Sequence, residues 1–253
     1  MLTVPEPARW GPILAGPLPE HLGLILDGNG RWASSRALAR TEGHLAGAEA
    51  FAEACRFAAE LKIPHLTLFT FALANFARSQ QEVDLLMDFP HWLLTPLLVE
   101  QIEALGAGFS FLGDVGDDRI PKSTQEFIAS TGRPTGSTST TITILFAYQY
   151  RMDETGASDE LPDLDLVVRT GGESRLSGFL PRQSMNAELI FTDVLWPDFR
   201  RGHLVAAIAE YQSRSRRFGR EPGGGTMLAP PDHPDEQGTQ AKSQGCCNRG
   251  TTG

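Results

Sequence analysis

Short apolar runs alternate with amphipathic stretches along most of this 253-residue chain. Apolar runs bounded by turn residues are typical of buried strands, whereas apolar positions spaced three or four apart are typical of helices. The pattern predicts strands over residues 22–26, 66–71, 108–112, 141–148 and 164–168, and helices over residues 46–61, 81–105 and 204–218. Gly219 would end the last helix. Because strands alternate with helices, we expect a single-domain α/β fold with a mainly parallel central β-sheet flanked by helices on both faces.

The two ends of the chain differ from this body. Residues 1–20 hold several prolines and no clear period, which predicts an irregular N-terminal arm. From residue 220 onward Gly, Pro, Gln, Thr and Ser dominate, and large aliphatic residues are almost absent. Such a segment buries too little apolar surface to offset its ordering entropy, so residues 220–253 are expected to form a disordered tail. The sequence therefore predicts one domain over residues 21–219.

Composition narrows the class of protein. With 41% hydrophobic and 21% charged residues, the chain can build one sizeable core. Its formal net charge of −9 argues against broad nucleic-acid binding, which usually needs a basic surplus. Three cysteines are too few and too badly spaced for a disulfide framework, so a reducing cytoplasm is expected. We see no signal peptide and no apolar run long enough to span a bilayer, which leaves at most peripheral membrane contact.

The first predicted strand leads directly into the glycine-rich motif DGNGRW at residues 27–32. A buried strand that ends in such a turn and a helix start presents free backbone N–H groups to an anion. Here a carboxylate, Asp27, and a guanidinium, Arg31, flank those groups. The motif is typical of a diphosphate site, although Asp-Gly and Asn-Gly are equally typical of a simple tight turn.

Polar residues also follow other predicted strands. Asn75, Phe76, Arg78 and Glu82 come after the second strand. Arg169, a Gly-Gly pair, Arg175 and Ser177 follow the fifth, and Glu188 lies just ahead of a further apolar run. In parallel sheets, ligands bind beyond the carboxyl ends of the strands. Three arginine-bearing loops and two carboxylates would share one crevice there, which suits two diphosphate groups and a Mg²⁺ ion held by carboxylates and phosphates.

Several of these segments together resemble the cis-prenyltransferases typified by undecaprenyl diphosphate synthase. The matching stretches are residues 21–32, 43–47, 71–83, 169–177, 187–199 and 210–219. They follow the family's order, and the resemblance extends over nearly all of residues 20–219, so coincidence is a poor explanation. The resemblance implies the cis-prenyltransferase fold with a hydrophobic tunnel, Mg²⁺ as cofactor, isoprenoid diphosphates as substrates and a homodimer.

The resemblance also implies a role for each matching residue. Asp27 would hold Mg²⁺ and the allylic diphosphate, and Glu188 would be the second acidic contact to the metal. The implied catalytic residues are Asp27, Asn29, Arg31 and Asn75. The implied substrate-binding residues are Gly28, Gly30, Trp32, Arg40, His44, Phe71, Phe76, Arg78, Glu82, Arg169, Arg175 and Ser177. The last three would hold a second, homoallylic diphosphate such as isopentenyl diphosphate.

The chemistry that this family performs needs electrostatic help. Diphosphate leaves C1 of the allylic substrate as the π-bond of the second substrate attacks, and a proton is then lost. Charge builds on the departing oxygens, so Mg²⁺ and fixed cationic donors would supply most of the rate enhancement. Apolar walls would hold the isoprenoid tail and exclude water. Residues 89–92 (FPHW) would obstruct the tunnel and predict a short product, and Pro90 should break or kink the predicted helix.

Departures from the family pattern leave the reaction open. Residues 71–79 (FALANFARS) stand where the family has Phe-Ser-x-x-Asn-Trp-x-Arg-Pro, so Ala72 lacks a hydroxyl often assigned to a proton relay. Residues 152–162 form only a short polar loop where the family has further helices. Head-to-tail condensation with isopentenyl diphosphate is one hypothesis. Irregular coupling of two allylic diphosphates to a branched, lavandulyl-type product is the other.

Simpler interpretations exist for single residues. His44 alone would be an ordinary histidine at a helix start, and Arg169 and Arg175 could pair with Glu173 or Asp165 in a structural network. The chain could also be a non-catalytic scaffold subunit of a prenyltransferase complex. Such a scaffold would have no need of its clustered carboxylate and arginines. A P-loop kinase is excluded because the Gly-x-x-x-x-Gly-Lys-Ser/Thr motif is missing.

Overall fold

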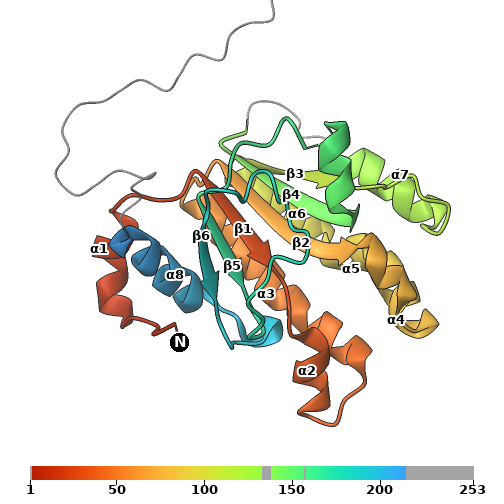
Figure 1. The fold of residues 1–253 in the computed structure, drawn as a ribbon, viewed down its shortest axis with the longest axis horizontal. Helices are drawn as coiled ribbons and strands as arrows, with labels where there is room; N and C mark the ends of the chain where they lie inside the picture. The colour runs from red at the N-terminus through yellow and green to blue at the C-terminus, as the bar shows by residue number, and fades with distance from the viewer. Residues whose placement is uncertain (1, 133–137, 157, 215–253) are drawn as a thin grey trace, which may run out of the picture. The chain divides into compact units, whose positions relative to one another are not determined.

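The computed structural model describes residues 2–132, 138–156 and 158–214 of the chain (Figure 1). Its strands are β1 (His21–Ile25), β2 (His65–Ala72), β3 (Ala107–Leu112), β4 (Thr140–Tyr148), β5 (Leu166–Arg169) and β6 (Glu188–Phe191). They form one sheet in the order β3-β4-β2-β1-β5-β6, and every neighbouring pair is parallel. This confirms the α/β fold class and the predicted strands. The short strand β6 was not predicted.

The helices are more divided than the sequence pattern predicts. They are α1 (Trp10–Leu14), α2 (Asn29–Ser34), α3 (Arg40–Glu60), α4 (Gln80–Met87), α5 (Phe89–Leu93), α6 (Pro96–Ala104), α7 (Lys122–Thr131) and α8 (Arg201–Ser213). Short 3-10 turns are η1 (Pro7–Arg9), η2 (Leu73–Ala77), η3 (Tyr150–Thr155) and η4 (Trp196–Asp198). The single helix predicted over residues 81–105 is wrong. Pro90 and Pro96 each occupy a first helical turn, where the missing N–H costs nothing, and so begin new helices.

Both chain ends also differ from the prediction. The arm is not wholly irregular, because it contains η1 and α1, and α1 packs against α8. Gln212 of α8 donates hydrogen bonds to the carbonyls of Ile13 and Pro17, at 2.8 and 2.9 Å. Helix α8 ends at Ser213, ahead of the predicted end, and Gly219 and the tail over residues 220–253 lie outside the described residues. Among the described residues, no helix is long and apolar enough to cross a membrane.

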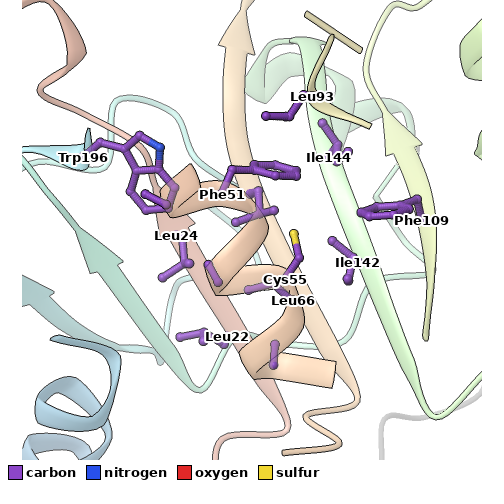
Figure 2. Packing of buried hydrophobic residues seen from close by; sticks show 14 of the residues in the cluster. Leu22, Leu24, Phe51, Cys55, Leu66, Leu93, Phe109, Ile142, Ile144 and Trp196 are labelled. Atoms are coloured by element: carbon purple, nitrogen blue, oxygen red, sulfur yellow. The ribbon is translucent and has the colours of Figure 1, made fainter. Parts of the chain in front are cut away.

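Two apolar clusters lie on the two faces of the sheet. Side chains alternate between faces along a strand, so Leu22 and Leu24 share one face and Ile25 lies on the other. Figure 2 shows Phe51 and Cys55 of α3 packed against the first of these faces. The second face is covered largely by loop residues such as Phe179 and Leu180, not by long helices as predicted. The carboxyl ends of the central strands stay accessible between these two layers.

Candidate active site

A cleft of about 350 Å³ opens at the carboxyl ends of β1, β2 and β5. Its polar lining residues are Asp27, Thr70, Asn75, Arg78, Arg169, Arg175 and Ser177. All of these except Thr70 belong to the predicted site. The structure therefore brings together groups that follow three different strands, as the position of ligand sites in parallel sheets predicts.

Asp27 lies at the centre of this edge, two residues after β1. Its Oδ1 accepts a hydrogen bond from Arg31 Nη2 at 3.0 Å, and its Oδ2 accepts one from Arg169 Nη2 at 2.8 Å. Burial would raise the pKa of Asp27, but the hydrogen bonds and charges of Arg169 and Arg31 lower it below its usual value. The side chain is 30% exposed. Asp27 is therefore an ionised carboxylate with access to the cleft.

The turn after Asp27 needs glycine. Gly28 has a φ of 115°, and a Cβ there would lie 2.9 Å from the Cα of Leu195. This left-handed residue turns the chain out of β1 so that α2 can begin at Asn29. The predicted strand, glycine turn and helix start are confirmed, and the turn places Arg31 back over Asp27.

Arg169 is the buried anchor of the second predicted subsite. Its side chain is 5% exposed, and its Nη1 donates to Ser177 Oγ at 2.8 Å and to the carbonyl of Arg175. Arg175 instead carries a 62% exposed side chain that pairs with Glu173 at 2.5 Å. The structural alternative therefore holds in part for Arg175. Arg169 pairs with Asp27 and lies in the cleft.

Thr170 and Gly171 contribute to the site although sequence reasoning assigned them no role. The Thr170 Oγ1 accepts from the backbone N–H of Asp27 at 3.0 Å and lies 2.7 Å from its carbonyl. Arg31 Nη1 donates to the carbonyl of Gly171. The loop after β5 thus ties itself to the end of β1. The sequence signal for this contribution was a small polar residue followed by glycines directly after a predicted strand.

Four predicted residues gather beside the cleft around one buried carboxylate. Glu82, in the first turn of α4, is buried. Its Oε1 accepts from His44 Nε2 at 2.9 Å and from Arg78 Nη1 at 2.8 Å, and its Oε2 accepts from Arg40 Nε at 3.1 Å. Burial would raise the pKa of Glu82, but its three partners lower it. We call these four residues the Glu82 cluster. The Glu82 carboxylate is surrounded by these side chains and does not line the cleft.

Three of the predicted substrate contacts have other positions. Phe71 is 1% exposed and packs in the core, with Phe76 edge-on to it at 5.0 Å. Phe76 in turn lies under the guanidinium of Arg119 at 3.8 Å. Trp32 donates its Nε1–H to Asp198 Oδ1 at 2.8 Å. Packing holds Phe71 and a loop contact holds Trp32, and neither side chain lines the cleft.

Asn75 and Asn29 are both held by backbone. Asn75 Oδ1 accepts from the N–H of Ala72 at 3.0 Å, which fixes η2 at the rim of the cleft. Asn29 Nδ2 donates to the carbonyl of Leu26 at 3.2 Å. The buried Oδ1 of Asn29 has no hydrogen-bond partner among the described residues. Asn29 also lines a separate small pocket.

That pocket stands where the sequence predicts a tunnel. It has a volume of about 30 Å³ and is lined by Leu26, Asn29, His44, Gly47, Ala48, Phe51, Thr70, Leu86, Phe89, Leu93 and Trp196. Phe89 meets Phe51 edge-on, with ring centroids 6.2 Å apart. The aromatic obstruction predicted at Phe89 is in place. At this point the described residues enclose room for about one water molecule and no long tunnel.

Glu188 does not reach Asp27. It begins β6 opposite Leu166, whereas Arg169, which contacts Asp27, lies opposite Phe191 at the other end of the strand. Glu188 Oε2 accepts from Arg214 Nη1 at 2.9 Å. Within one chain, Glu188 and Asp27 therefore lie at opposite ends of the parallel strands. The described residues contain no group of three or more acidic, His or Cys side chains that could hold a metal.

Asp27 by itself still fits a magnesium site of the kind that phosphates complete. Mg²⁺ usually binds through one or two carboxylates plus the phosphates of its substrate. Asp27 is ionised and opens onto a cleft lined by Arg78, Arg169 and Arg175, which suit phosphate oxygens. The donor set is therefore compatible with Mg²⁺ once a diphosphate is bound.

Comparison with known proteins agrees with this geometry. A family model described as "Putative undecaprenyl diphosphate synthase" matches residues 25–161 and 152–219. An isoprenyl transferase of Porphyromonas gingivalis is 37% identical over 233 residues, which cover 80% of this chain and 90% of that protein. One from Bacillus subtilis is 35% identical and covers 82% and 90%. The crystal structure of lavandulyl diphosphate synthase from Lavandula x intermedia, in complex with dimethylallyl diphosphate, has a TM-score of 0.65 and 26% identity, covering 80% and 98%.

Proposed function

Because the chain belongs to the undecaprenyl diphosphate synthase family, we propose that it joins an allylic diphosphate to isopentenyl diphosphate and makes a short cis-prenyl diphosphate. One observation carries the proposal. Asp27 is held ionised between Arg31 and Arg169 at the mouth of a cleft that Arg78 and Arg175 also line. Two anionic groups can bind such a cleft side by side, one on each side of Asp27.

The residues divide into two diphosphate subsites. The first lies at the start of α2 and beside the Glu82 cluster, where Arg31, His44 and Arg78 offer donors to the allylic diphosphate. The second lies after β5, where Arg169, Arg175 and Ser177 would hold the homoallylic diphosphate. Guanidinium groups suit both tasks because their planar forks bind phosphate oxygens in pairs.

The reaction follows from this placement. The bond from C1 of the allylic substrate to the diphosphate oxygen breaks, a carbon–carbon bond forms from the π-electrons of the second substrate, and a proton leaves. Arg31 and Arg78 would stabilise the charge that develops on the departing oxygens. Mg²⁺, held by Asp27 and the phosphates, would neutralise part of the same charge.

The small pocket supports a short product. A growing isoprenoid chain needs apolar space beyond the first diphosphate subsite. Phe51, Phe89 and Leu93 close the pocket that begins at Asn29 and His44, and it holds only about 30 Å³. A side chain in this position limits chain length because packed interiors give way little.

A second candidate is irregular coupling of two allylic diphosphates. The observation that favours it is the similarity to lavandulyl diphosphate synthase. Ala72 lines the cleft where the family pattern has serine, so it offers no hydroxyl to a proton relay. Irregular coupling would use the same ionising residues and differ only in the second substrate.

Assembly and location complete the proposal. We propose a homodimer in the cytoplasm, which rests on the family resemblance and on the low cysteine content. Cys55 is buried, and burial raises the pKa of its thiol. A non-catalytic scaffold is the alternative of a different class. The pairing of Asp27 with two arginines at an open cleft argues against it, because an unused charged cluster has no reason to stay accessible.

Product analysis tests the proposal. Purified protein with Mg²⁺ is incubated with dimethylallyl, geranyl or farnesyl diphosphate, with and without isopentenyl diphosphate, and dephosphorylated products are identified by mass spectrometry. A short linear product that requires isopentenyl diphosphate is the expected result. A branched product from allylic diphosphate alone would support irregular coupling. No product from any pair would overturn the catalytic proposal and support a scaffold.

A further inference from the structure

The Glu82 cluster joins three parts of the candidate site through one carboxylate. Arg40 and His44 come from α3, and Arg78 follows η2. All three donate to Glu82 at 2.8 to 3.1 Å, and the two oxygens of Glu82 share them. The side chains of Arg40 and Arg78 are 58% and 33% exposed, whereas Glu82 is 5% exposed. The cations thus face outward from a buried anion.

Each of the three cluster partners also contacts another part of the site. Arg78 lines the cleft, and His44 lines the small pocket beside Asn29. The guanidinium of Arg40 lies over Gly30 so closely that a Cβ there would be 2.6 Å from its Nη1. Gly30 is therefore needed for this close approach. Among the residues that the structure describes, Glu82 is the hydrogen-bond acceptor that all three share.

The charge of the cluster favours an anion in front of it. Glu82 contributes one negative charge and the two arginines contribute two positive charges, so the cluster stays cationic even with His44 neutral. Without Glu82 the two guanidinium groups would repel each other and lose their common direction. A diphosphate cannot contact a carboxylate favourably, so a direct binding role for Glu82 is electrostatically unfavourable.

We infer that Glu82 is a positioning residue, which aims Arg40, His44 and Arg78 at one diphosphate group without touching the substrate. The inference rests on the proposed function, since it assumes that the first diphosphate subsite lies in front of these donors. It also assigns Glu82 an indirect role in place of the substrate contact that the family resemblance implied. Displacing catalytic groups by about an ångström can cost on the order of a hundredfold in rate.

The charge of Glu82 has a second, measurable effect on His44. Burial lowers the pKa of His44, Glu82 raises it, and Arg78 and Arg40 lower it again. These are the charged groups that surround the imidazole. Glu82→Gln removes the only one of them that favours the protonated ring. The pKa of His44 should therefore fall further in this variant.

Glu82→Gln tests the inference against Glu53→Gln as a matched control. Glu53 is also a glutamate that accepts hydrogen bonds at α3, from the N–H of Arg201 at 2.9 Å, but it belongs to the α3–α8 contact. Three quantities are measured on each full-length variant. They are the Kd for inorganic diphosphate by calorimetry, the KM and kcat for the allylic substrate, and the His44 pKa by NMR of the imidazole.

We expect Glu82→Gln to weaken diphosphate binding and raise KM by about tenfold or more, which corresponds to one or two lost charge-assisted contacts. The His44 pKa should fall. Glu53→Gln should change neither. Glu82→Asp keeps the charge but its shorter side chain loses the hydrogen bond to His44, so it should raise KM and lower the His44 pKa by less than Glu82→Gln does. It replaces Glu82→Gln if that variant does not fold.

Unchanged diphosphate affinity and unchanged His44 pKa in a folded Glu82→Gln protein would overturn the positioning role. Equal losses in Glu82→Gln and Glu53→Gln would do the same, because they would show a general effect on stability. If the unaltered protein makes no product, the proposed function fails. Diphosphate binding and the His44 titration still decide the role of Glu82 in that case.

Discussion

The amino ends of the parallel strands form one edge of the sheet and their carboxyl ends form the other. Both edges bury polar groups, and at the carboxyl edge the described residues also form an open cleft. At the amino edge, His21 is fully buried and its ring nitrogens lie 2.8 Å from the carbonyl of Pro162 and from Thr67 Oγ1. Glu188 pairs with Arg214 at the same edge. At the carboxyl edge, Asp27 and the arginines around it line a cleft of about 350 Å³.

This difference separates structural from functional polar groups. His21 is satisfied within the fold, and its surroundings leave no room for a ligand, so its polarity serves the packing of loops onto strand ends. Asp27 and Arg31 are also paired, yet their side chains stay 30% and 48% exposed. Polar groups of the candidate active site therefore differ from structural polar groups in that they line a shared open cleft. Burial and pairing occur in both.

Asp27→Asn should have the largest effect. It removes the charge that would bind Mg²⁺ while keeping a side chain of similar size, and several kcal/mol of transition-state stabilisation should be lost. We expect kcat to fall about a thousandfold or more. Rates of product formation measure this, and circular dichroism confirms the fold. Normal turnover by Asp27→Asn would show that the cleft at the carboxyl edge is not the active site.

The amino edge should instead govern stability against acid. Burial lowers the pKa of His21 from 6.5 to about 4. Between these pH values His21 takes up a proton in the unfolded chain but stays neutral in the folded protein. The free energy of unfolding should therefore fall by up to about 3 kcal/mol as pH drops from 6.5 to 4.

Urea denaturation at several pH values measures this dependence. His44, His65 and His203 also have lowered pKa values and contribute with the same sign. The variant His21→Gln isolates the share of His21, because the slope of stability against pH should become shallower. An unchanged slope would show that His21 does not resist protonation in the folded protein.

Phe89→Ala should change the product rather than the rate of ionisation. Removing the ring would enlarge the pocket behind Asn29 and His44, where Phe89 now meets Phe51. We expect products longer by at least one isoprene unit, detected by mass spectrometry. Trp92→Ala is a useful comparison, since Trp92 packs on Phe89 but does not line the pocket. The same product length in both variants and the parent would show that this pocket does not hold the tail.

Glu188→Gln should have the smallest effect. Its ion pair with Arg214 is partly exposed, at 23% and 32%, and such pairs contribute about 1 kcal/mol or less. The melting temperature should fall only slightly. A large loss of product formation by a normally folded variant would contradict the assignment of Glu188 to a structural role. It would indicate that Glu188 of a second copy contributes to the site.

The sequence could predict the strands and the residues that follow them because both depend on local order. A residue after a parallel strand must lie at its carboxyl edge, which located Asp27, Asn75 and Arg169. Glu188 was misplaced by the same rule, because it begins β6 and so lies at the opposite edge. Identifying the short run after Glu188 as a strand would have prevented this error.

Other features depend on contacts that local sequence does not encode. Glu82 meets Arg40 and His44 only because α3 and α4 pack together, about forty residues apart along the chain. Trp32 contacts Asp198 across an even longer separation. The break at Pro90 follows from the rule that proline interrupts a helix, and the structure confirms it. The break at Pro96 was readable in principle, since proline favours a first helical turn, but the long apolar period obscured it.

A crystal structure with Mg²⁺ and a non-hydrolysable allylic diphosphate analogue tests the central claim most directly. We expect the diphosphate in the cleft at the carboxyl ends of β1, β2 and β5, with its oxygens in contact with Arg31 and Arg78 and its metal on Asp27. A diphosphate bound away from this cleft, or Asp27 still paired with both arginines and free of metal beside a bound analogue, would contradict the account.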